Sequence, residues 1–233
     1  MLGAYLNGLN RLKPPSGGSK PIDFDIIKLF YSVLNERNYD DCVWRAVYAF
    51  GHNAIKRPGE YTTDRPLVSA LQWNGRDWRL PKSTDIHFCT FNYSKSKTNQ
   101  LGKAEWAVLS CMCPNPCALH ELYRILCVRV DLSPTNPIFI FRNGMILNYN
   151  KLRNKTNYLK KKLKLENLDL TPHGVRKGGA QDLIARGVPP ALIMSQAGWS
   201  STKSLHTYIK NMPKEKSVKW FLKWWNTEFK NDK

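Results

Sequence analysis

The sequence is poor in acidic residues and has no long apolar run. Eighteen Asp and Glu stand against 36 Lys and Arg, which leaves a formal net charge of +18. An excess of this size indicates a polyanionic partner. The chain contains no run of about 18 apolar residues, which is the length needed to span a bilayer. Its first fifteen residues also lack a signal-peptide core. We therefore expect a soluble, intracellular protein without a membrane partner.

Cysteine is also sparse, with six residues in a chain of 233. This number does not suggest a secreted disulfide framework, so we expect reduced thiols. Three of them, Cys111, Cys113 and Cys117, closely precede His120 and suggest zinc ligands. Structural zinc sites usually show two paired ligand clusters, however, and only the cysteines at positions 89 and 127 could complete a second one. Buried thiols at the start of a helix are the interpretation that we favour.

The length allows one sizeable domain with short appendages. Residues 1–20 end in a Pro, Gly and Ser cluster that is typical of a linker. Residues 214–233 form a lysine-rich amphipathic helix crowded with aromatic side chains. That helix could pack on its own domain or lie on a membrane surface, but its large apolar area favours a protein partner. The aromatic residues are Trp220, Phe221, Trp224, Trp225 and Phe229.

The remaining residues, 21–213, predict a mainly α domain of the α+β class with a small antiparallel sheet. Apolar residues at helical spacing indicate core helices over 23–37 and 42–55, and further helices are expected over 119–130 and 151–165. Short apolar and β-branched runs at 86–91 and 106–109 flank an Asn and Gly turn, which favours a hairpin. Residues 136–144 indicate a short strand and turn.

The most informative stretch runs from Thr171 to Asn211. Thr171 can cap a helix whose first turn contains Pro172, so His173 and Arg176 fall three apart on one helical face. Further along, Gly187 is a plausible left-handed stop, Pro189 and Pro190 open a short helix that ends near Gly198, and Tyr208 lies on the next helical segment.

These residue types suit phosphate chemistry. The guanidinium of Arg176 can fork onto two phosphate oxygens, and the imidazole of His173 can move a proton near neutral pH. The indole N–H of Trp199 can donate one hydrogen bond, and a tyrosine oxygen at such a site could attack phosphorus.

In type, order and spacing, this stretch resembles the signature of the tyrosine recombinases, the phage integrase family. The matching residues are His173-Gly-Val-Arg176, then Gly198-Trp199, then Tyr208 ten residues after that glycine. Trp199 in place of the commoner second histidine is similar to the Cre recombinase subgroup. The cysteine- and proline-rich middle of the chain also resembles the integrases of eukaryotic mobile elements and their viruses.

The resemblance implies that Tyr208 attacks a DNA phosphodiester and forms a 3′-phosphotyrosine link, without metal, ATP or another cofactor. It further implies that Arg57 is a second phosphate clamp, with Glu60 orienting the site. A hairpin lysine would protonate the leaving 5′ oxygen; Lys97 is the best match, with Lys95 and Lys103 as competitors. The family often docks a C-terminal helix into a neighbouring protomer, which implies a homo-oligomer on DNA and a tetramer in synapsis.

A basic segment outside the signature is expected to contact double-stranded DNA through its backbone. It has leucines on one face and cationic side chains on the others. These cationic residues are Lys151, Arg153, Lys155, Lys160, Lys161 and Lys162. In the family an N-terminal helical domain clamps the other face of the DNA, and residues 1–20 resemble only the tail of its last helix.

The function that we expect is site-specific DNA cutting and rejoining wherever DNA is accessible: in the nucleus of a eukaryotic host, or else in a viral factory or the cytoplasm. Type IB topoisomerases and telomere resolvases share a similar constellation, although spacing and length favour a recombinase. A catalytically silent, DNA-binding remnant of a mobile element and a zinc-dependent nucleic-acid module remain as alternatives.

Overall fold

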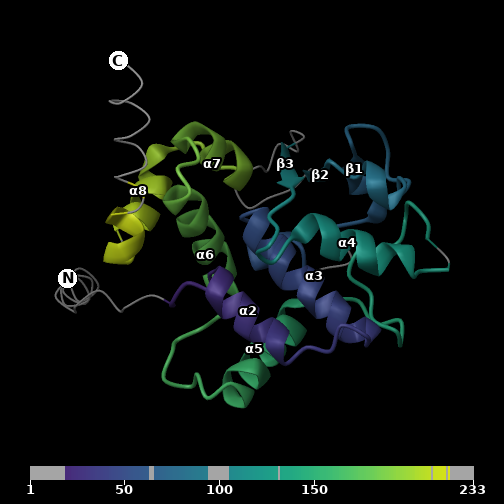
Figure 1. Ribbon diagram of the computed structural model, residues 1–233, viewed down its shortest axis with the longest axis horizontal. Coiled ribbons are helices and arrows are strands. Elements are labelled where there is room, and N and C mark those ends of the chain that lie inside the picture. The colour runs from purple at the N-terminus through teal and green to yellow at the C-terminus, as the bar shows by residue number, and fades with distance from the viewer. Residues whose placement is uncertain are drawn as a thin grey trace, which may run out of the picture.

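The computed structural model describes residues 19–62, 66–93, 105–130, 132–210, 212–218 and 220. Its helices surround a central helix, α3, which contacts α2, α4 and α6 (Figure 1). Among the described residues, none of the helices combines the length and apolar character needed to cross a membrane. The long helices are α2 (Phe24–Ser32), α3 (Tyr39–Asn53), α4 (Ala118–Cys127), α5 (Tyr149–Lys162), α6 (Pro172–Ala185), α7 (Pro190–Ala197) and α8 (Thr202–Lys210).

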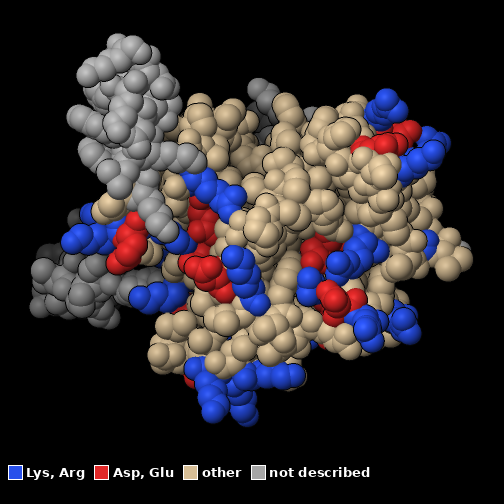
Figure 2. Space-filling view, in the orientation of Figure 1, with Lys and Arg blue, Asp and Glu red and all other residues tan. Residues whose placement is uncertain are grey.

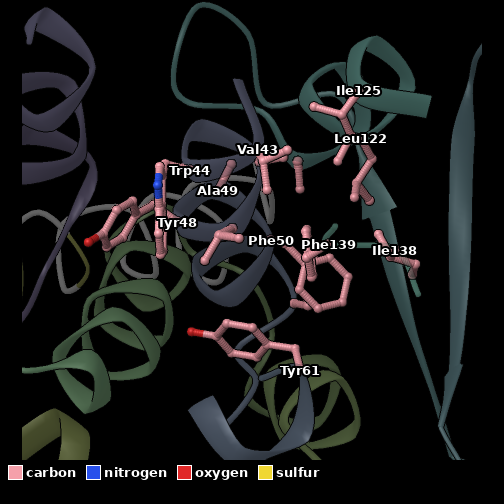
Figure 3. Packing of buried hydrophobic residues seen from close by; sticks show 14 of the residues in the cluster. Val43, Trp44, Tyr48, Ala49, Phe50, Tyr61, Leu122, Ile125, Ile138 and Phe139 are labelled. Atoms are coloured by element: carbon pink, nitrogen blue, oxygen red, sulfur yellow. The ribbon is translucent and has the colours of Figure 1, made fainter. Parts of the chain in front are cut away.

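The central helix α3 is buried along most of its length, so aromatic side chains pack around it from several elements. Phe50 makes edge-on contacts with Tyr61, Phe91 and Phe139, with ring centroids 5.8, 5.0 and 5.4 Å away. Figure 3 shows Phe50, Tyr61 and Phe139 of this cluster together with Leu122 and other aliphatic side chains. Such offset and edge-on pairs add specific geometry to the apolar area that they bury. This main core therefore fixes the turn that follows α3.

Beside α4 lies a three-stranded antiparallel sheet in the order β1-β2-β3, with β1 (Leu71–Trp73), β2 (Phe88–Tyr93) and β3 (Glu105–Ser110). Phe91 is paired with Leu71 on one side and Ala107 on the other. All three side chains are buried because alternate residues of each strand face the core. The expected antiparallel pair is confirmed, whereas β1 was not predicted because three residues are too few to show alternation.

A second, smaller core lies between α6, α7 and α8. Among the described residues it contains nine buried side chains, and Met112, from the segment between β3 and α4, packs against both cores. The residues of this second core are Ile55, Ala180, Leu183, Ile184, Ile193, Ala197, Trp199, Leu205 and Met212. The elements that carry the signature residues are thus packed as a unit against the main core.

Glycines let α6 approach its neighbours at backbone distance. A Cβ on Gly178 would collide with the backbone of Ile22, and one on Gly179 would collide with the carbonyl group of His52 in α3. Only residues without a side chain allow such contacts. The first turns of α6 are therefore held directly against the chain before α2 and against α3.

Two expected elements differ from the structure. The first helix ends at Ser32 instead of continuing to residue 37. There Asn35 accepts a hydrogen bond from Arg37 N–H at 2.9 Å and donates its own N–H to Asp41 at 3.0 Å, so side chains replace the helical pattern. The strand expected within 136–144 is wrong: only isolated bridges form, at Pro137 and at residue 140. Proline cannot donate to a ladder.

Candidate active site

The start of α6 carries His173 and Arg176, as the spacing predicted. Thr171 occupies the N-cap position in an extended conformation and Pro172 follows as the first helical residue, although the Thr171 side chain makes no capping hydrogen bond. The helix ends before Gly187, whose φ of 75° is left-handed as expected. His173 and Arg176 therefore lie on the first turn of a helix held against the core.

Arg176 is 1% exposed, and its charge is matched within the protein. Its Nη2 donates to the carbonyl oxygen of Ala197 at 3.0 Å, and Nη1 lies 3.6 Å from Glu60 Oε2. Burial lowers the pKa of Arg176, while Glu60 and the side chain of Tyr208 act in the opposite direction. A guanidinium so restrained is a preorganised cation.

Glu60 is the last residue of the 3₁₀ turn η1 (Pro58–Glu60), and it also holds Arg57, the N-cap residue of that turn. Its Oε2 accepts the backbone N–H of Arg57 at 2.7 Å, and its Oε1 lies 3.4 Å from Arg57 Nη1. The Arg57 side chain is 31% exposed, whereas that of Glu60 is 8% exposed. One buried carboxylate thus joins two arginines that lie 119 residues apart in the sequence.

His173 lies in the field of these cations. Its pKa is lowered first by burial and then by Arg176, Arg57 and Lys177. At neutral pH the imidazole is therefore uncharged and able to accept a proton.

Trp199 and Tyr208 complete the cluster. Gly198, in the left-handed conformation that ends α7, turns the chain toward Trp199, which is 8% exposed. The rings of Trp199 and Tyr208 stack, with centroids 4.8 Å apart and planes inclined by 25°. Arg176 Cζ lies 5.3 Å from the Trp199 ring, which places the guanidinium beside the stacked pair. The structure thus brings together Arg57, Glu60, His173, Arg176, Trp199 and Tyr208.

Lys95, Lys97 and Lys103 lie in the segment 94–104, outside the described residues. The strands on either side of it are described, and β3 is attached to α7 by a side chain. Gln196 accepts the N–H of Val108 at 2.9 Å and donates to its carbonyl at 2.7 Å. Sequence reasoning did not single out Gln196, since nothing in the sequence relates it to β3.

The basic residues of α5 differ in their exposure and in whether they are paired with other groups of the protein. Lys155 lies 3.2 Å from Asp41, and Lys151 donates to the carbonyl of Ile146 at 2.9 Å. Arg153, Lys161 and Lys162 are exposed, and Lys160 is half-buried. Figure 2 shows a group of basic side chains over α5 at the lower edge, whereas elsewhere on that face acidic and basic residues intermix. The exposed members are the most accessible to a phosphate backbone.

A further network, absent from the sequence analysis, fixes the segment after α8. Asp182 accepts from the N–H of Phe24 at 2.8 Å and lies 2.8 Å from His52 Nε2 and 2.6 Å from Lys216 Nζ. Burial alone would raise the pKa of Asp182, but His52 and Lys216 hold it at about 2. This carboxylate therefore joins α2, α3 and the chain beyond Tyr208.

Within the part of the chain that the structure describes, one group of side chains could hold a metal ion. The ligand atoms of Cys111, Cys113, Cys117 and His120 all lie within 4.8 Å of one another. The prediction of buried thiols is wrong for Cys111 and Cys113, which are exposed, while Cys117 is buried. The histidine of this group, His120, is exposed and follows Cys117 by three residues.

Known proteins support the same fold. Residues 117–215 match the model of the phage integrase family, and no curated protein sequence matches the chain significantly. Among solved structures, XerA recombinase has a TM-score of 0.61 at 15% identity, over 91% of this chain and 65% of that one. XerH site-specific recombinase bound to difH substrate has a TM-score of 0.57 at 13% identity, over 82% of this chain and 50% of that one.

The Tn1549 transposon integrase in complex with circular intermediate DNA has a TM-score of 0.50 at 14% identity, over 84% of this chain and 62% of that one. The chain thus spans between half and two thirds of the structures that it resembles. These matches cover 82–91% of the chain, so they extend beyond the residues of the family match. Residues 117–215 therefore resemble the phage integrase family, and the chain has the fold of a tyrosine recombinase catalytic domain.

Proposed function

We propose that the protein is a site-specific DNA recombinase that cuts and rejoins double-stranded DNA through Tyr208. The observation that carries this proposal is the joint arrangement of two arginines on one buried carboxylate, a neutral imidazole beside them and a tyrosine stacked against Trp199. Each group matches a need of phosphoryl transfer, in which positioning and charge stabilisation supply most of the catalysis.

The proposed reaction has two balanced steps. Tyr208 Oη attacks phosphorus, the bond from phosphorus to the 5′ oxygen breaks, and a 3′-phosphotyrosine remains. A 5′-hydroxyl then attacks this link, the DNA bond re-forms and the tyrosine is released. Because the phosphotyrosine conserves the energy of the phosphodiester, the proposal requires neither ATP nor a metal in the reaction.

The side chains divide the chemistry between them. His173 accepts the proton of Tyr208, and Arg57 and Arg176 stabilise the pentavalent transition state by about 3 kcal/mol each. Trp199 donates its indole N–H to the phosphate or packs against it. Lys97, or alternatively Lys95 or Lys103, protonates the leaving 5′ oxygen.

Binding of the duplex would use the exposed cations of α5 together with its partly engaged lysines. The Tn1549 integrase is bound to circular intermediate DNA and XerH to its difH substrate, which supports a DNA partner for this chain. We further propose a homo-oligomer on DNA, a tetramer in synapsis, assembled through residues 214–233. Trp220 packs against the second core of its own chain, whereas residues 221–233 lie outside the described part. Action in the nucleus, a viral factory or the cytoplasm belongs to the same proposal.

Covalent trapping tests the proposal. The protein is incubated with nicked DNA from the ends that flank its gene, denatured, and examined for a DNA-linked band. We expect the band with the wild type and with Tyr149→Phe, which alters an exposed tyrosine of α5, but not with Tyr208→Phe.

Two results would count against Tyr208 as the nucleophile or against catalysis by this chain. A band that persists in Tyr208→Phe would show that Tyr208 is not the nucleophile. DNA bound tightly by the wild type without any covalent product, even with a separately expressed N-terminal clamp domain added, would favour a silent DNA-binding protein.

A further inference from the structure

We infer that Cys111, Cys113, Cys117 and His120 bind one structural zinc ion. These residues are neither part of the proposed chemistry nor dependent on it. They lie between the end of β3 and the first turn of α4, a short connection beside the end of α3 (Figure 1).

The distances fit a tetrahedral ion. His120 Nδ1 lies 3.2 Å from Cys117 Sγ and 3.4 Å from Cys113 Sγ, and all four ligand atoms lie within 4.8 Å of one another. With Zn–S near 2.3 Å and Zn–N near 2.0 Å, neighbouring S and N ligands of a tetrahedral zinc are about 3.5 Å apart. Small side-chain adjustments would therefore complete the coordination.

The donor set favours zinc over harder cations. Three sulfurs and one imidazole nitrogen match the Cys₃His class of structural zinc sites, whereas calcium and magnesium prefer oxygen ligands. The sequence spacing, C-x-C-x₃-C-x₂-H, lets four ligands come from the ten consecutive residues 111–120. The local turn alone thus assembles the site.

Backbone groups hold the side chain of Cys117 in place. This residue is buried at the N-cap of α4, where its side chain makes no capping hydrogen bond, and the N–H of Met112 donates to its sulfur at 3.3 Å. Such supporting contacts are typical around metal ligands.

The proposed zinc would stabilise the junction between the two cores. Met112, between two of the ligands, packs against both cores. At the end of α3, Asn53 accepts the N–H of Ala118 at 2.8 Å and donates to the carbonyl of Pro116 at 3.4 Å. The metal-bound turn is therefore connected to the end of α3 through Asn53, four residues before Arg57.

Elemental analysis of the full chain, purified under reducing conditions with zinc in the growth medium, tests the inference. We expect one zinc per chain in the wild type and at least about a tenfold loss of zinc affinity in Cys113→Ser and in His120→Ala. Matched controls are Cys127→Ser and His87→Ala, which alter an exposed cysteine and an exposed histidine outside the cluster and should retain the metal.

A second measurement remains valid if a variant folds poorly. Cobalt added to the chelator-treated wild type should give the ligand-field absorption of a tetrahedral thiolate site, and zinc should abolish this signal and raise the melting temperature. The inference would be overturned by wild-type protein that binds neither metal, by iron in place of zinc, or by equal zinc content in the ligand variants and the wild type.

Discussion

The indole of Trp199 lies almost parallel to the phenol of Tyr208, with ring centroids 4.8 Å apart. Because the two residues come from opposite sides of the turn between α7 and α8, the stack sets the direction from which Tyr208 enters the site. Arg176 lies beside the same indole. Trp199 therefore contacts both the proposed nucleophile and a proposed phosphate clamp.

Two substitutions separate the contributions of Trp199. Trp199→Phe should keep the melting temperature within a few degrees and lower the single-turnover cleavage rate about a hundredfold, because a ring remains but the N–H donor is lost. Trp199→Ala should destabilise the protein by about 3–5 kcal/mol through the cavity that it leaves. A near wild-type rate in Trp199→Phe would show that the indole acts by packing alone.

Replacement of Glu60 by Gln should cost much more than loss of an ordinary surface ion pair. The change removes the carboxylate charge facing buried Arg176, and breaking a buried pair typically costs about 3–5 kcal/mol. Urea unfolding followed by circular dichroism measures the loss. Asp77→Asn is the matched control: its partner Arg79 is 2.7 Å away, both are exposed, and stability should change little. Equal effects of the two variants would contradict a structural role of Glu60.

The pH dependence of cleavage should report His173. Burial and three nearby cations lower its pKa from the ordinary value of 6.5. A general base remains active until it is protonated, so the acidic limb of the rate profile should have its midpoint below pH 6.5. Single-turnover cleavage across pH 4.5–8 measures this limb. It should disappear in His173→Gln, which cannot titrate; an unchanged limb in that variant would assign it to another group.

Asp182 should contribute to stability at neutral pH and lose that contribution in acid. Its folded-state pKa of about 2 is below the ordinary 3.8, so the stabilisation is complete above pH 3.8 and disappears as the pH falls toward 2. The shift corresponds to about 2 kcal/mol at pH 7. We expect Asp182→Asn to lower the unfolding free energy by at least this amount.

Denaturant unfolding at several pH values measures the effect of Asp182→Asn, and the difference from the wild type should narrow below pH 3.8. Asp25→Asn provides the control, because that carboxylate is exposed and its ion pair with Lys28 is long, at 4.0 Å. A difference that does not vary with pH would mean that Asp182 acts through packing and not through its charge.

Much of the fold could be predicted because its signals are local. Apolar spacing located α3 and α4, and Pro190 and Gly198 marked the ends of α7 within a residue. The spacing of His173, Arg176 and Tyr208 likewise follows from consecutive elements. These features depend on residues near one another in the chain, which is where propensity and capping rules apply.

The contacts that the sequence could not show are between distant residues. The attachment of β3 to α7 depends on one amide of Gln196, and the network of Asp182 depends on Lys216, 34 residues later. Each is a single polar pair with no periodic pattern, so only the packed structure reveals it. The sequence did name the three cysteines together with His120, but it favoured buried thiols because a second ligand pair was expected; the proximity of the four ligand atoms is visible only in the structure.

The glycines of α6 determine which part of the site can adapt. A helix that packs through side chains can slide slightly as rotamers change, but Gly178 and Gly179 place the backbone of α6 against other backbone, which has no rotamers to change. His173 and Arg176 are thus on a fixed base. If the site adjusts to successive DNA strands, we expect the change in α8 and the chain beyond, so that the proposed nucleophile moves while the proposed clamp stays in place.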